Sequence, residues 1–104
     1  MNKTYFKDKV IIITGASSGI GLASARLFGN CGAKVVMAAR HLDKLQAEVP
    51  SVSDDSDNVL CVKTDVSKEE DCKMLINKAV EKFGRIDILV NNAGISMRAM
   101  FKDL

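Results

Sequence analysis

The chain has 104 residues, of which 47% are hydrophobic, and this length allows one domain at most with an apolar core. Its formal net charge of +2 is too small to indicate nucleic acid or an anionic membrane surface as a partner. No apolar run approaches the roughly 18 residues of a membrane span and the N-terminus lacks the apolar core of a signal peptide, so we expect a cytoplasmic protein.

The first half of the chain alternates between predicted strands and helices. Residues 10–14 form an unbroken, β-branched apolar run, which predicts a strand covered on both faces. A helix follows and ends at Gly32. Its expected buried face consists of Ile20, Ala23, Ser24, Leu27, Phe28 and Cys31. Residues 34–39 predict a second strand, residues 42–49 a short helix that ends at Pro50, and residues 51–58 a polar surface loop.

The second half repeats this alternation. Residues 59–64 predict a third strand, and Ser67 with Glu70 has the spacing of a capping box that opens a helix. Gly84 ends that helix. Its apolar stripe is Cys72, Leu75, Ile76, Ala79, Val80 and Phe83. Residues 86–90 predict a fourth strand, residues 91–94 a turn, and residues 100–104 the beginning of another helix.

Strands that alternate with helices predict an α/β fold with a Rossmann-like, doubly wound parallel sheet. We expect the strand order 3-2-1-4, truncated before the remaining strands of such a sheet. The first two long helices would cover one face and the third the other. Ligands of these sheets bind at the carboxyl ends of the strands, and the motif residues described below directly follow the four predicted strands. The odd number of cysteines, without a C-x-x-C spacing, indicates reduced thiols and no metal site.

The glycine-rich segment Thr14–Gly21 (TGASSGIG) joins the first strand to the first long helix. Such a turn leaves backbone N–H groups at the helix N-terminus free to bind a phosphate. The first glycine allows a tight exit from the strand, the second a close approach to a pyrophosphate, and the third close packing of helix on sheet. The expected cofactor contacts are Gly15, Ser17, Ser18, Gly19, Ile20 and Gly21. A glycine-rich turn without a ligand is the alternative.

Three motifs carry a resemblance to the short-chain dehydrogenase/reductase family. The segment Thr14–Gly21 is similar to the family's T-G-x-x-x-G-x-G cofactor motif, and Asn91–Gly94 to its N-N-A-G motif. Asp65 and Val66 resemble the pair that contacts adenine. The resemblance implies that residues 1–104 are an incomplete NAD(P)-binding Rossmann half-domain. It also implies an oxidoreductase that interconverts an alcohol and a carbonyl with NAD(P)(H).

The end of the second strand predicts which cofactor binds. Many NAD-binding folds place an acidic residue about 20 residues after the glycine turn, where it binds the ribose 2′-hydroxyl. Here the neutral Ala39 occupies that position and Arg40 follows it. A guanidinium can pair with a 2′-phosphate through two hydrogen bonds. We therefore predict NADP(H) rather than NAD(H), unless Arg40 is only a solvated loop charge.

The ends of the third and fourth strands supply the remaining predicted contacts. Asp65 is expected to accept a hydrogen bond from the adenine amino group, and the Val66 backbone to border the ring. Alternatively, Asp65 serves only to end its strand. Asn92, Ala93 and Gly94 are expected beside the ribose. Asn91 is assigned a structural role, in which its amide ties neighbouring strands together.

The family's catalytic serine, tyrosine and lysine have no counterpart here, so we assign no catalytic residue and expect this chain alone to be inactive. Tyr5 and Lys9 have the Y-x-x-x-K spacing, but they precede the first strand and belong to the opposite edge of the sheet. Ser96 follows the Asn-Asn-Ala-Gly turn without a nearby base. The resemblance implies a small-molecule substrate and a homo-oligomer, and an open edge at the fourth strand favours self-association. A non-catalytic dinucleotide-binding or sensing module, and an interaction domain with a vacant site, are the alternatives.

Overall fold

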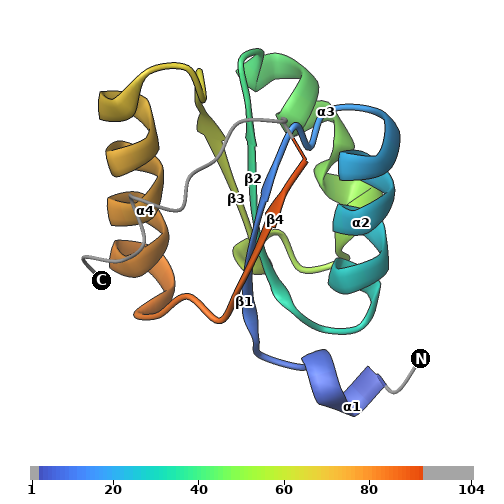
Figure 1. The fold of residues 1–104 in the computed structure, drawn as a ribbon. Coiled ribbons are helices and arrows are strands. Elements are labelled where there is room, and N and C mark those ends of the chain that lie inside the picture. The colour runs from blue at the N-terminus through green and yellow to red at the C-terminus, as the bar shows by residue number, and fades with distance from the viewer. Residues whose placement is uncertain (1–2, 93–104) are drawn as a thin grey trace.

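Four parallel strands form one twisted sheet, which the computed structural model shows together with its helices for residues 3–92 (Figure 1). The elements in chain order are α1 (Lys3–Phe6), β1 (Val10–Thr14), α2 (Gly19–Asn30), β2 (Lys34–Ala39), α3 (Leu42–Val52), η1 (Ser56–Asn58), β3 (Val59–Lys63), α4 (Glu69–Phe83) and β4 (Ile88–Asn91). The strand order is β3-β2-β1-β4, which confirms the predicted topology. The turn and helix expected beyond residue 92 lie outside the described residues.

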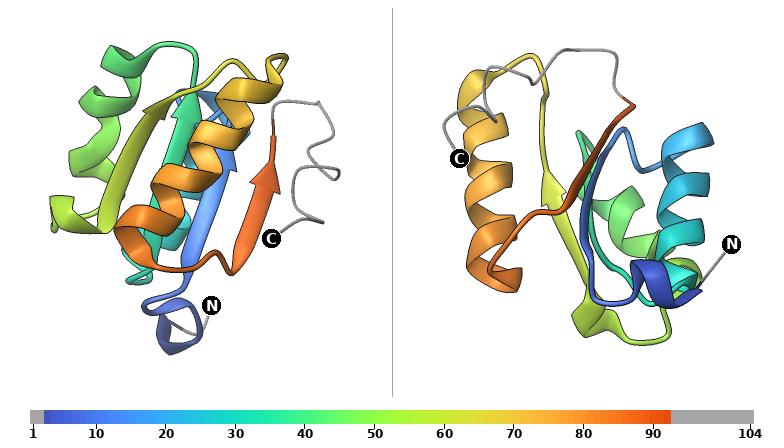
Figure 2. Two further views of the ribbon diagram at one scale, coloured as in Figure 1. Left: turned by 90° about the vertical axis from the view of Figure 1, so that its left-hand side faces the viewer. Right: turned by 60° about the horizontal axis from the view of Figure 1, so that its bottom comes forward.

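Helices cover both faces of the sheet, as predicted (Figure 2). One core lies between the sheet and the α2–α3 layer and contains Ile11 and Ile13 of β1. The other lies under α4 and contains Val10 and Ile12 of the same strand. All five residues of β1 are buried, because successive side chains of a strand point to opposite faces and both faces are covered. Among the described helices, none is long and apolar enough to cross a membrane.

The face predicted for helix α2 is only partly buried: Phe28 packs against the core and Cys31 is buried, as expected. Ile20 is 74% exposed and Leu27 is 46% exposed, although both were expected in the core. The buried residues of the helix itself are instead Gly21, Leu22, Ala25 and Gly29. The helix backbone lies so close to its neighbours that mostly small residues fit between them. The hydrophobicity pattern missed this face because two of its four members are glycines.

Helix α3 does not end before Pro50 but continues to Val52, so the predicted boundary was wrong. A proline in the last turn removes only one backbone donor from the helix. The Val52 side chain is fully buried in the α2–α3 core, which favours the extra turn. The expected polar loop also contains the short helix η1. Its cap is Asp55, whose carboxylate accepts a hydrogen bond from the Asp57 N–H at 3.0 Å.

Helix α4 starts one residue later than the predicted capping box requires. Lys68 occupies the cap position and makes no side-chain cap bond. The Ser67 hydroxyl donates instead to Asp65 Oδ1 at 2.6 Å, and Asp71 rather than Glu70 reaches back, with Oδ2 accepting from the Asp65 N–H at 2.9 Å. The helix ends as predicted at a left-handed glycine, residue 84. Most of the predicted stripe is buried, whereas its member at position 80 is exposed.

Candidate functional site

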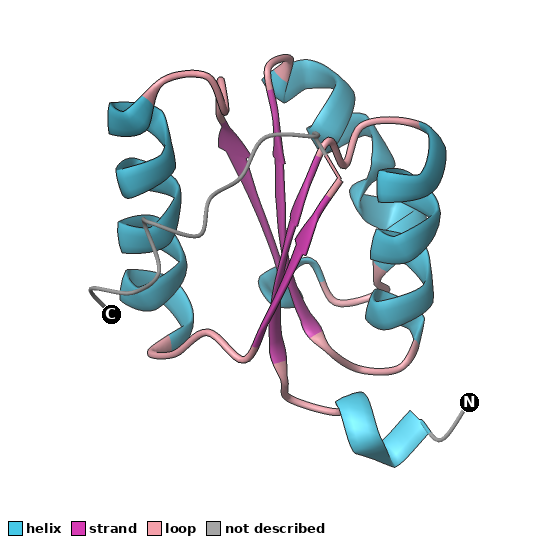
Figure 3. Cartoon of the chain, in the orientation of Figure 1, coloured by secondary structure: helices cyan, strands magenta, loops and turns pink. Residues whose placement is uncertain are grey.

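The loops that follow the strands meet at the carboxyl edge of the sheet, at the top of Figure 3. The Ala16 N–H donates to the Ala38 carbonyl at 3.1 Å and thereby joins the loop after β1 to β2. The Thr64 N–H donates to the Ala39 carbonyl at 2.8 Å and joins the residue after β3 to β2. These bonds place three loops from distant parts of the chain around one edge, where ligands of parallel sheets bind.

The glycine turn is as tight as its sequence predicts. Gly15 has a φ of +62°, a left-handed backbone conformation that residues other than glycine rarely adopt. A Cβ built at Gly21 would lie 2.1 Å from the Gly15 carbonyl oxygen and 2.9 Å from Asn92 Nδ2. The first turn of α2 therefore lies directly against the strand exit, which requires glycine at position 21. The same contact places Asn92 beside the glycine turn.

The N-terminus of α2 offers unshared hydrogen-bond donors. Ser18 precedes the helix in an extended conformation, and its side chain makes no cap bond. The first intrahelical bond runs from the Leu22 N–H to the Ser18 carbonyl at 3.2 Å, so the N–H groups of residues 19–21 have no acceptor within the helix. Its first turn contains no acidic residue. These N–H groups lie at the positive end of the helix dipole, and no carboxylate in the first turn competes for them, so they suit a phosphate group.

A pocket of about 210 Å³ lies beside this turn. It is lined by Gly15, Ser17, Ala39, Arg40, His41, Thr64 and Val66. Four of these residues were predicted as cofactor contacts, at positions 15, 17, 40 and 66. Ala39, His41 and Thr64 were not. Thr64 is buried, and its hydroxyl donates to the Val62 carbonyl at 3.1 Å. Its position immediately after β3 is the one signal in the sequence that could have indicated it.

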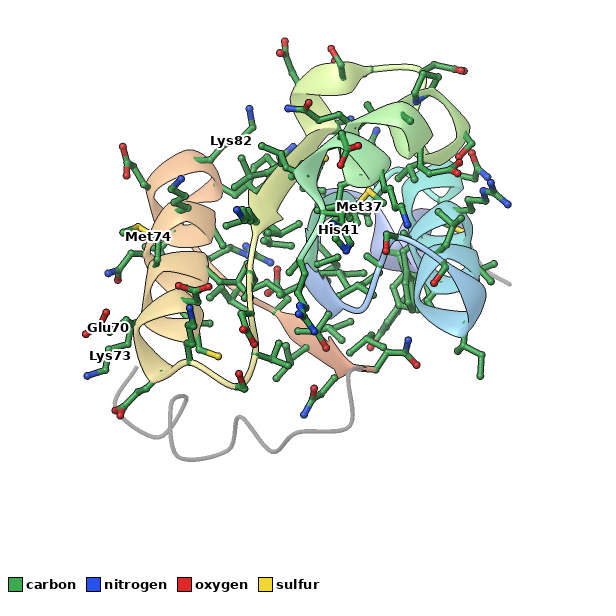
Figure 4. All side chains as sticks on the ribbon, turned by 90° about the horizontal axis from the view of Figure 1, so that it is seen from above. Met37, His41, Glu70, Lys73, Met74 and Lys82 are labelled. Atoms are coloured by element: carbon green, nitrogen blue, oxygen red, sulfur yellow. The ribbon has the colours of Figure 1, made fainter. Side chains whose placement is uncertain are left out.

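A second pocket of about 290 Å³ adjoins the first and shares Arg40 and His41 with it. His41 lies at the carboxyl edge, which Figure 4 shows from above. The second pocket is lined by Arg40, His41, Lys63, Asp65, Lys68 and Asp71. The hydrogen bonds from the Ser67 hydroxyl and N–H lower the pKa of Asp65, with smaller contributions from the positive charges of Arg40 and Lys68. Asp65 thus holds the turn after its strand, which was its alternative role, while its contact with adenine stays a prediction.

The end of β4 has the structural role predicted for its asparagine. The Thr14 hydroxyl donates to Asn91 Oδ1 at 3.1 Å and links the ends of β1 and β4. The next residue, Asn92, faces the glycine turn, as described above. Ala93 and Gly94, the other two predicted contacts at this strand end, lie outside the described residues.

Tyr5 and the three cysteines line neither of the two pockets. Tyr5 lies in α1, below the amino end of the sheet in Figure 1, as the sequence predicts. Cys31 and Cys72 are buried and Cys61 is partly buried, and none forms a disulfide. Burial raises the pKa of Cys61 and Cys72, so both remain thiols at neutral pH. Within residues 3–92, no group of three His, Cys, Asp or Glu residues could hold a metal ion.

Comparison with known proteins identifies relatives that share both sequence and fold. Residues 9–104 match the profile of the short chain dehydrogenase family. An uncharacterized oxidoreductase of Listeria monocytogenes is 51% identical over 89 residues, which cover 86% of this chain and 36% of the relative. The apo form of glucose dehydrogenase from Caenorhabditis elegans superposes with a TM-score of 0.81 at 40% identity, over 90% of this chain and 41% of that one.

Solved relatives include complexes with both nicotinamide cofactors. The C-domain of a bacterial malonyl-CoA reductase with NADP has a TM-score of 0.83 at 36% identity, over 90% of this chain and 16% of that one. A 3-ketoacyl-(acyl-carrier-protein) reductase from Brucella melitensis with NADH has a TM-score of 0.73 at 38% identity, over 81% and 33%. The chain spans about a third of the length of the first curated relative. Sequence and fold together show that this chain belongs to the short-chain dehydrogenase/reductase family of oxidoreductases.

Proposed function

We propose that this chain is the cofactor-binding part of an NADP(H)-dependent oxidoreductase that interconverts an alcohol and a carbonyl. The observation that carries the proposal is the glycine turn. Its two constrained glycines hold the N-terminus of α2 against the end of β1, and donor groups of residues 19–21 lack helical acceptors. This geometry fits a pyrophosphate, which is the part shared by both nicotinamide cofactors. When bound, the nicotinamide supplies hydride transfer.

The two adjoining pockets support an adenosine site next to that turn. The smaller pocket has an apolar wall at Ala39 and Val66, which suits a flat base, and a polar wall at Ser17 and Arg40. Oδ1 of Asp65 accepts from Ser67, and the carboxylate has a second oxygen that can accept from an adenine amino group. Asn92 beside the turn fits its predicted place near the ribose.

The preference for NADP(H) rests on Arg40. This residue is exposed, lines both pockets, and enters no ion pair among the described residues. No acidic residue lines the smaller pocket, so nothing there would repel a 2′-phosphate or bind a free 2′-hydroxyl as a carboxylate does. Solved relatives bind NADP or NADH, so the family alone does not determine the choice.

The test compares the dissociation constants of NADPH and NADH for the wild type and Arg40→Ala. A charge-assisted bond contributes about 1.5–3 kcal/mol, so the variant should bind NADPH roughly 10- to 150-fold more weakly, with NADH affinity little changed. Lys44→Ala is the matched control, because Lys44 is exposed and lines neither pocket. Equal affinity for the two cofactors in the wild type, unaltered in Arg40→Ala, would contradict the NADP(H) preference.

A further inference from the structure

The larger of the two pockets at the carboxyl edge carries more positive charge than its neighbourhood neutralises. Its cations are Arg40, Lys63 and Lys68. Among the described residues, none of the three has a carboxylate oxygen within 4.0 Å of its side-chain nitrogens, whereas Lys34 and Lys73 elsewhere on the surface do. Lys63 is the last residue of β3 and Lys68 immediately precedes α4, so the two lysines flank the β3–α4 loop, whereas Arg40 follows β2.

The carboxylates of this pocket are engaged with donors of their own loop. Asp65 Oδ1 accepts from the Ser67 N–H at 3.0 Å and from the Ser67 hydroxyl at 2.6 Å. Asp71 Oδ2 accepts from the Asp65 N–H at 2.9 Å. His41 is the one remaining titratable group in the lining. The carboxylates brace the β3–α4 loop, and Asp65 partly compensates the charges of Arg40 and Lys68. Three cations against two carboxylates still leave the lining with an excess of one positive charge, and none of the three cations forms an ion pair among the described residues.

We propose that Lys63 and Lys68 are specificity-determining residues that act with Arg40 to favour a nucleotide bearing a 2′-phosphate. This inference rests on the proposed function, because it assigns further residues to the same site. The two lysines act through their charge across the pocket, and Arg40 supplies the direct contact. Lysine suits this role, since its ammonium is a compact charge on a flexible stem.

The size of the effect follows from Coulomb's law. We take about 9 Å as an order-of-magnitude separation between each ammonium and the phosphate. At that distance in water, a phosphate charge of about −1.5 to −2 makes each lysine change the affinity by roughly threefold to fivefold. Removal of both should weaken binding about tenfold at low ionic strength. At 0.15 M salt, where the Debye length is about 8 Å, screening should reduce this loss to about threefold.

The experiment uses adenosine 2′,5′-bisphosphate and adenosine 5′-monophosphate, which differ only in the 2′-phosphate. Isothermal titration of the intact chain would compare the wild type, the double variant Lys63→Gln/Lys68→Gln and Arg40→Ala at low and physiological salt. The matched control is Lys78→Gln/Lys82→Gln. It removes the same charge from the C-terminal half of α4, whereas Lys68 lies at the N-terminus of that helix; Figure 4 labels Lys82 at the C-terminal end. Circular dichroism would verify that each variant is folded.

We expect the double variant to lose about tenfold in bisphosphate affinity at low salt and the control to lose less than twofold, with monophosphate affinity nearly constant in both. If Arg40→Ala loses bisphosphate affinity but the lysine variant matches the wild type, the lysine assignment is wrong and the proposed function stands. If the lysine variant weakens both nucleotides equally, the lysines do not determine specificity. If the wild type binds neither nucleotide, the proposed function fails together with this inference.

Discussion

Aspartate side chains brace the chain at both edges of the sheet. At the amino edge, Asp87 accepts from Arg85 Nε at 2.9 Å and from the Val10 N–H at 2.8 Å, which fixes the start of β1 beside the approach to β4. The bonds from Arg85 and from the Val10 N–H lower the pKa of Asp87. At the carboxyl edge, Asp65 is held in the same way by Ser67. Donors favour the charged form of each carboxylate, so these contacts depend on pH.

Asp87→Asn should lower stability at pH 7 by about 1 kcal/mol, or roughly 4–8 °C in Tm, because the amide keeps one acceptor oxygen but loses the charge. The folded-state pKa of Asp87 lies below the ordinary value of 3.8. Its stabilisation is therefore fully present above that value and is lost as the pH falls through the lowered pKa. Thermal melts from pH 7 to pH 2 should show the wild type and variant converging in acid.

The control for this prediction is Asp54→Asn, because Asp54 is exposed and enters no ion pair within residues 3–92. Its melting temperature should follow that of the wild type at every pH. A difference between Asp87→Asn and the wild type that stays constant down to pH 2 would show that the lowered pKa makes no contribution to stability.

At the scale of the elements, α2 and α3 pack through their backbones. A Cβ built at Gly29 would lie 2.1 Å from the Val52 carbonyl oxygen, so the two helices approach more closely there than any side chain permits. The pair is also linked at its surface by an ion pair of 3.0 Å between Arg26 and Glu48. Close packing of this layer fixes α2 against the sheet, and with it the glycine turn at its N-terminus.

Gly29→Ala tests this packing. In an exposed helix, replacing glycine by alanine stabilises by up to about 1 kcal/mol, because alanine has the higher helix propensity. Here the added methyl group meets the backbone of α3, and we expect a net loss of about 1–3 kcal/mol from overpacking. Ala23→Gly on the exposed face of the same helix measures the propensity term alone. Urea or thermal unfolding measures the change in stability, and a Gly29→Ala variant more stable than the wild type would refute the close approach.

At the scale of the whole molecule, the proposed site exists only when the sheet is assembled. The smaller pocket takes residues from the loops after β1, β2 and β3, which are distant in the sequence and are joined at one edge by the parallel strands. A nucleotide that binds this site has no comparable site in the unfolded chain. Binding should therefore stabilise the fold by mass action.

NADPH should raise the melting temperature of the chain in a concentration-dependent manner. At a concentration 100 times the Kd, the stabilisation is about 2.7 kcal/mol, which corresponds to roughly 10–20 °C for a domain of this size. NADH at the same concentration should produce a smaller shift if Arg40 selects the phosphorylated cofactor. Differential scanning fluorimetry measures both, and a melting temperature independent of either nucleotide would indicate an interaction domain with a vacant site.

Local pattern and general topology rules were enough to predict much of this protein. The run 10–14 predicted a buried strand, and the alternation of strands and helices predicted the parallel sheet with order 3-2-1-4. The glycine spacing predicted the tight turn, because positive φ and close backbone approach both require glycine. These features depend on short-range sterics, which the residue types determine, and on the right-handedness of βαβ connections, which is a general rule for such folds.

Only the tertiary structure decided which small residues are buried and which polar groups meet. The burial of Gly21 and Gly29, the extension of α3 to Val52, and the pairing of Asp71 with the Asp65 N–H depend on distances between elements. Neither a hydrophobicity pattern nor a capping motif contains such distances, so the first placed Ile20 in the core and the second placed the cap of α4 one residue early. Each pocket at the carboxyl edge likewise requires the packed sheet, because its lining comes from separate loops that only strand pairing brings together.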